Sequence, residues 1–186
     1  KLGRLRMVGE LDPYQHLITT HDDTANYDAG LFNDTNDFRC DQQHSRFREF
    51  ILAQRQQRSW PVANVDFGYE QGLKGPDDKT YRITPTPEEL VRRALEISMA
   101  GGYTAYYYTY TAWDVLRPAD HPVGYGYFHS MRKFFETTRY WELSPLDGVA
   151  SSGWVLGNPG SEYVIYQQSG VEFELTLPVN QSTYSG

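Results

Sequence analysis

The stretch Pro61-Val-Ala-Asn-Val-Asp-Phe-Gly-Tyr-Glu70 decides the fold that this sequence predicts. A short apolar run between a proline and a glycine is typical of a buried parallel strand, so we expect a strand at 61–66. The strand ends in a carboxylate, Asp66, and a second one, Glu70, follows the turn. Acids just past the C-terminal end of such a strand lie where α/β barrels and open α/β sheets keep their chemistry. The alternative is that both acids only satisfy backbone N–H groups near the turn.

Helices and strands alternate on both sides of this stretch. Apolar residues at helical spacing predict helices at 1–11, 42–58, 87–100 and 124–138. The third has Thr86 as its N-cap, with Pro87 at the first helical position. The expected strands cover 16–21, 61–66 and 103–110, and the first of them delivers His21 at its C-terminal end. This order predicts parallel strands with right-handed helical crossovers.

The pattern changes after Pro145. We expect short strands at 153–156, 162–167 and 171–177, joined by turns with good turn chemistry. The last of them alternates apolar and polar residues cleanly. Strands of this kind joined by short turns form antiparallel sheets. The sequence therefore predicts two units, a first at 1–145 and the beginning of a β domain at 146–186.

Composition excludes several classes of protein. The chain has 186 residues and a net charge of −7, which argues against a nucleic-acid partner. No apolar run approaches the roughly 20 residues that a membrane helix needs. The single cysteine, Cys40, excludes an internal disulfide and has no evident activating base beside it. No glycine-rich phosphate loop is present, and we expect no cofactor.

Aromatic residues are unusually frequent, at 15% of the chain, with 15 tyrosines and 4 tryptophans. Tyr and Trp combine an apolar face with a polar tip, which suits stacking on sugar rings and hydrogen bonding to hydroxyls. The alternative, that they are core and interface residues, fits the segment 103–110 poorly because its tyrosines fall on both faces.

The stretch 22–41 is rich in Asp and Asn. Such oxygens suit calcium, but the EF-hand spacing is absent, and a solvated acidic loop is favoured over a metal site.

Four segments resemble one enzyme family in their order along the chain. They are Asp12-Pro-Tyr-Gln-His-Leu-Ile-Thr-Thr-His21, Asp41-Gln-Gln-His44, Asn64-Val-Asp-Phe-Gly-Tyr-Glu70 and Ala100-Gly-Gly-Tyr103. Together with 127–141 and 150–177 they resemble the apiosidase-like glycoside hydrolases. These are (β/α)₈ barrels followed by a small β domain, often labelled a collagen-binding domain.

The resemblance implies that the three expected strands are the sixth, seventh and eighth of a (β/α)₈ barrel. The family places a catalytic Glu at the end of the seventh strand, where this chain has Asp66. The implied catalytic residues are Asp66 and Glu70. The implied sugar-binding residues are His21, Tyr69, Tyr108 and Trp113. The resemblance also implies a secreted or periplasmic protein that acts on plant or other complex polysaccharides or oligosaccharides.

Glycoside hydrolysis needs two carboxyl groups on opposite sides of the scissile bond. In this family the second one lies on an earlier strand, outside this chain. We therefore expect that the isolated chain is inactive, and that either an N-terminal half-barrel or a second copy completes it. A non-catalytic carbohydrate-binding protein with an aromatic-rich face is the alternative.

Overall fold

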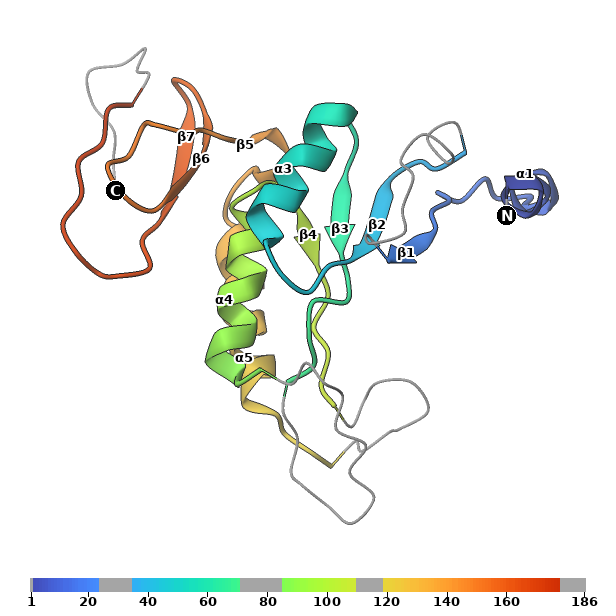
Figure 1. The fold of residues 1–186 in the computed structure, drawn as a ribbon, viewed down its shortest axis with the longest axis horizontal. Coiled ribbons are helices and arrows are strands. Elements are labelled where there is room, and N and C mark those ends of the chain that lie inside the picture. The colour runs from blue at the N-terminus through green and yellow to red at the C-terminus, as the bar shows by residue number, and fades with distance from the viewer. Residues whose placement is uncertain (1, 24–34, 71–84, 110–118, 178–186) are drawn as a thin grey trace.

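The computed structural model describes residues 2–23, 35–70, 85–109 and 119–177 (Figure 1). A parallel sheet runs through the middle of the molecule, and a small antiparallel sheet lies at one end. The parallel sheet contains β1 (His21–Asp23), β2 (Arg39–Gln42), β3 (Val62–Asn64) and β4 (Tyr103–Thr104), in that order. The antiparallel sheet contains β5 (Ser144–Pro145), β6 (Trp154–Asn158) and β7 (Glu162–Tyr166).

The four expected helices are confirmed, although the one expected at 42–58 begins only at Phe47 and Gln42 belongs to β2. They are α1 (Leu2–Leu11), α3 (Phe47–Gln57), α4 (Pro87–Ser98) and α5 (Val123–Phe135), and a short 3₁₀ helix, η2, covers Tyr140–Glu142. The start of α4 is as expected, because the backbone N–H of Glu89 donates to Thr86 Oγ1 at 3.2 Å.

One hydrophobic core joins the helices to the parallel sheet. Leu90, Ala94 and Ile97 of α4 are fully buried against Ile51 of α3 and Val62 of β3. The partly buried side chains that pack against this core include Phe128 and Met131 of α5. The core therefore fixes three helices on the face of the sheet that carries Val62.

The strand order explains why these helices share a face. The order β1-β2-β3-β4 follows the chain without reversal, and every pair is parallel. Right-handed crossovers in an unreversed order place successive helices on the same side, whereas a doubly wound sheet reverses its order and carries helices on both. Because side chains alternate along a strand, the register places His21, Cys40 and Ala63 together on the opposite face.

The expected strand at 16–21 is wrong, because β1 begins only at His21. Upstream of β1, Asp37 forms hydrogen bonds with backbone groups that would otherwise pair with a neighbouring strand. Its carboxylate accepts from the Ile18 N–H at 2.7 Å, and its own N–H donates to the Ile18 carbonyl at 2.8 Å. A side-chain acceptor 19 residues further along the chain thus competes with sheet pairing in this segment.

The parallel sheet has four strands rather than the three expected, because β2 lies within the stretch that the sequence indicated as a loop. This strand is polar, and it buries an ion pair. Arg39 Nε donates to Asp41 Oδ2 at 2.5 Å, Nη2 pairs with the other carboxylate oxygen, and both side chains are at most 1% exposed. The spacing of apolar residues gives no sign of a strand whose buried side chains are a charged pair.

Two further expectations are wrong. Residues 171–177 form only an isolated bridge between Ala150 and Leu175, although their alternation predicted a strand. Val171 stays 55% exposed, and alternation stabilises a strand only where one face is buried. The helical spacing behind the helix expected at 124–138 predicts that Tyr125 is buried, but Tyr125 is 66% exposed and meets the Tyr106 ring edge-on.

The antiparallel sheet packs against the ends of the helices. Leu143, Leu156 and Val164 form a second core with Met99, which follows α4. Arg48 of α3 pairs with Asp147 at 2.7 Å. The division into units at 1–145 and 146–186 stays a prediction.

Candidate functional site

Asp66 lies two residues past the C-terminal end of β3 and is 6% exposed. The Tyr69 hydroxyl donates to its Oδ2 at 3.0 Å. Its Oδ1 has no hydrogen-bond partner among the residues that the structure describes. A buried carboxylate oxygen without a donor costs free energy, and such groups in native proteins call for an explanation such as a catalytic role. Asp66 is thus held in place through one oxygen, while the other meets no donor within the described ranges.

Asn64 fixes the backbone that carries Asp66. It is fully buried at the end of β3, and its Oδ1 accepts from the Asp66 N–H at 3.3 Å. The same side chain ties β3 to the segment after β2, because Nδ2 donates to the Gln43 carbonyl at 2.9 Å. One amide therefore sets the position of the acid relative to the neighbouring strand.

Glu70 has a different environment from Asp66, although it belongs to the same stretch. It is 2% exposed, and its Oε2 accepts from the Tyr106 hydroxyl at 2.5 Å and from the Gly124 N–H at 2.9 Å. Gly124 is the second residue of α5, whose N-cap, Pro122, supplies no side-chain cap. Glu70 therefore caps the N-terminus of α5, and its negative charge complements the positive end of the helix dipole.

The close approach of Glu70 to α5 requires a glycine at position 124. A Cβ added there would overlap Glu70 Oε2. These contacts connect the stretch after β3 to the helix after β4, so they support a structural role for Glu70.

Glu70→Ala should lower the free energy of unfolding by about 2–4 kcal/mol, because the buried Gly124 N–H and the half-buried Tyr106 hydroxyl lose their shared acceptor. Urea denaturation measures the change. Glu136→Ala is the matched control: Glu136 is exposed at the other end of the same helix and pairs with the exposed side chains of Arg132 and Lys133, so its loss should have little effect. Equal effects of the two substitutions would contradict the anchoring role.

Two tyrosine hydroxyls, one beside Glu70 and one at the opposite end of the parallel sheet, are held in the neutral form. Burial raises the pKa of Tyr106 above its ordinary value, and the hydrogen bond to Glu70 raises it further. Burial also raises the pKa of Tyr140, whose hydroxyl donates to the carbonyls of Ser98 at 2.8 Å and Gly102 at 2.5 Å. On ionisation each hydroxyl would lose the proton that it donates, and its hydrogen bonds would be lost.

These raised pKa values predict a loss of stability in alkali. A group whose pKa is higher in the folded state stabilises the fold fully below its unfolded pKa, about 10 for tyrosine, and this contribution is lost as the pH rises above it. The melting temperature should therefore fall steeply above about pH 10. Tyr140→Phe should be less stable at pH 7, yet its melting temperature should fall less steeply above about pH 10. If the melting temperature of the Tyr106→Phe/Tyr140→Phe double variant fell as steeply as that of the parent protein, these two tyrosines would not be the cause of the alkaline loss.

The expected sugar-binding residues are only partly brought together. Tyr69 is 8% exposed, contacts Asp66, and packs its ring against Tyr107 at 5.6 Å between ring centres. Tyr108 is 4% exposed, and its hydroxyl donates to Asp120 at 3.0 Å. His21 is exposed at the start of β1 rather than at the end of a strand. Trp113 lies outside the described residues.

Sequence reasoning missed three residues that build this region: Asn64, Tyr106 and Gly124. A buried Asn in an apolar strand was a usable signal for the first, because buried amides need partners. Nothing local in the sequence connects Gly124 to Glu70.

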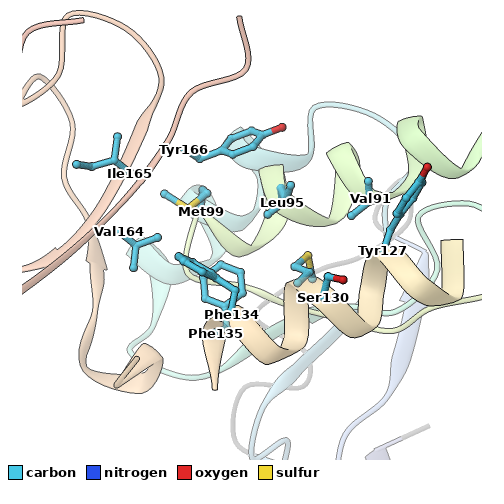
Figure 2. A pocket seen from close by; sticks show the side chains of 11 residues that line it. Val91, Leu95, Met99, Tyr127, Ser130, Phe134, Phe135, Val164, Ile165 and Tyr166 are labelled. Atoms are coloured by element: carbon cyan, nitrogen blue, oxygen red, sulfur yellow. The ribbon is translucent and has the colours of Figure 1, made fainter. Parts of the chain in front are cut away.

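An apolar groove of about 370 Å³ lies elsewhere, between α4, α5 and β7. Figure 2 shows side chains from all three elements pointing into it, among them Leu95, Phe134 and Val164. No Asp, Glu or His side chain lines it within the described part of the chain.

Metal ligands do not gather in the described ranges, where no three His, Cys, Asp or Glu side chains lie close enough to hold an ion. Most of the acidic stretch considered for calcium lies outside those ranges. Nor does any described helix have both the length and the apolar character needed to cross a membrane.

Comparison with known proteins gave no relative: no family model, curated protein or solved structure matches this chain. The likeness to the apiosidase-like glycoside hydrolases thus rests on the sequence segments alone.

Proposed function

We propose that this chain is the C-terminal part of a (β/α)₈ glycoside hydrolase that acts on plant or other complex polysaccharides or oligosaccharides. The observation that carries the proposal is Asp66, a buried acid just past the end of a parallel strand, with one oxygen that has no hydrogen-bond partner among the described residues. In (β/α)₈ enzymes, residues at the C-terminal ends of strands carry the chemistry.

The sheet topology supports a barrel over a doubly wound fold. An unreversed order of four parallel strands with helices α3 to α5 on one face is what a segment of a (β/α)₈ barrel has. The opposite face, which carries His21, Cys40 and Ala63, would then point into the barrel.

Asp66 acts in this proposal as the nucleophile or the general base. The second carboxyl group comes from another strand of the completed barrel, at about 5–5.5 Å for retention or about 6.5–9.5 Å for inversion. Tyr69 orients Asp66 through its hydroxyl. Glu70 anchors α5 and stands outside the chemistry.

The barrel is completed by an N-terminal half or by self-association. Among the described strands, β1 and β4 each pair on one side only, so each leaves an edge for further pairing. Light scattering of the 186-residue chain tests this step, and a monodisperse monomer with a sharp cooperative melt would contradict it.

A non-catalytic carbohydrate-binding protein is the second candidate. It is favoured by the burial of Asp66 beneath Tyr69. A nucleophile must come within bonding reach of the anomeric carbon, and the covering tyrosine stands in the way. The cluster of tyrosines at 103–108 supports sugar binding in either case.

Hydrolysis by the complete polypeptide that carries these residues decides between the two. A panel of aryl glycosides and plant oligosaccharides should include at least one that is cleaved. Tryptophan fluorescence, recorded on the same panel, reports binding. Binding without cleavage of any bound sugar would favour the second candidate, and neither binding nor cleavage would reject both.

A further inference from the structure

A second pocket, of about 320 Å³, lies at the opposite end of the parallel sheet from Asp66. Its wall comes from the end of α3, the turn before β3, the first residue of β4 and η2. We name it the Arg–Trp pocket after its lining residues: Arg55, Arg58, Ser59, Trp60, Tyr103 and Trp141, together with Pro61. Its size is at the lower end of the range for small-molecule sites.

The charge of the Arg–Trp pocket is positive. Two arginines line it, and its described lining residues include no acid, although the whole chain has a net charge of −7. Arg55 is fixed by a 2.9 Å bond from Nη1 to the Gly101 carbonyl, which uses one of the five N–H donors of a guanidinium. Arg58 lies over the Trp60 ring, 4.6 Å from its centre. Both cations are thus positioned by the protein rather than left as free surface side chains.

The aromatic walls of the pocket differ in exposure. Trp60 is 7% exposed and forms its fixed side, whereas Trp141 is 72% exposed and Tyr103 is 42% exposed. An exposed ring face beside hydroxyl and N–H donors suits the alternating apolar faces and polar edges of a sugar. The hydroxyls of Ser59 and Tyr103 supply further hydrogen-bonding groups.

We propose that the Arg–Trp pocket binds a carboxylate-bearing saccharide, a uronic acid unit. The planar guanidinium fork matches a carboxylate, and the Trp141 ring offers a platform for the sugar. This site is separate from the acid after β3, and the proposal does not depend on hydrolysis there.

The test compares methyl β-D-glucuronide with methyl β-D-glucoside, which differ only in the carboxylate. Binding is followed by the NMR shifts of the indole N–H signals of the whole protein. The glucuronide should bind at least tenfold more tightly. Arg58→Gln should weaken it about tenfold or more, Arg58→Lys less, and Trp141→Ala should weaken both sugars.

Matched controls separate this site from others. Arg92→Gln removes an exposed arginine that does not line the pocket, and Asp66→Asn alters only the proposed hydrolytic site, so both should leave glucuronide binding unchanged. Trp141 and Arg58 are exposed, so their variants should fold, which circular dichroism checks. Equal affinity for the two sugars, or glucuronide binding that survives both Arg58→Gln and Trp141→Ala, would overturn the proposal. Tighter binding of methyl phosphate or benzoate than of glucuronide would overturn the saccharide assignment.

Discussion

Asp66→Asn should lower the turnover of a cleaved glycoside by about 10²–10⁴-fold in the complete protein, the range expected when a group that accepts or donates the critical proton is removed. The amide keeps an oxygen that can accept from the Tyr69 hydroxyl, so the fold should be almost unaffected. Initial rates measure the loss of turnover, and a thermal melt of the same sample shows that the variant is folded.

The conservative variant Asp66→Glu sharpens this prediction. It restores the longer acid that the resembling family has in this position, and it should keep at least part of the activity. Glu70→Gln is the second control. It should lower the free energy of unfolding, whereas the turnover by the folded fraction should change little. Full turnover by Asp66→Asn, or loss of turnover only in the Glu70 variant, would place the chemistry elsewhere.

Breaking the buried Arg39–Asp41 pair should have the largest effect on stability. Asp41→Asn leaves the buried charge of Arg39 without a carboxylate, and Arg39→Met leaves the buried charge of Asp41 without a cation. Both side chains are at most 1% exposed. Losses of about 3–5 kcal/mol are typical when one partner of a buried pair is removed. Urea denaturation at pH 7 measures the difference from the parent protein.

The double variant Arg39→Met/Asp41→Leu tests whether the pair acts as a unit. Replacing both partners with apolar residues removes the desolvation cost along with the attraction, so most of the lost stability should return. Arg132→Met, at an exposed ion pair on α5, should change stability by less than about 1 kcal/mol. Additive losses from the two single substitutions at 39 and 41 would contradict direct pairing.

The helices were predictable because their signals are local. Thr86, Pro87 and Glu89 specify the start of α4 within one turn, and the apolar stripe at Leu90, Ala94 and Ile97 specifies the face that is buried. Neither signal depends on residues far away in the sequence. The strand β3 was predictable for a similar reason, as an apolar run between a proline and a glycine.

The errors arose where the spacing of apolar residues does not decide the outcome. The strand β2 is stabilised by a charge pair that no hydrophobic pattern reveals, and 16–20 is kept out of the sheet by Asp37. At the candidate site, the position of Asp66 after β3 followed from the sequence, but the role of Glu70 did not. Its partner Gly124 is 54 residues away, and only the folded chain brings the two together.

The most direct measurement is a crystal structure of the complete Asp66→Asn protein with an uncleaved oligosaccharide bound. The anomeric carbon should lie about 3–3.5 Å from the side chain at position 66, the distance of a near-attack arrangement. A second carboxyl group should lie across the scissile bond, at a separation of about 5–9.5 Å from the first. A sugar bound away from the end of β3, with the side chain at position 66 still covered by Tyr69, would contradict the proposed hydrolase.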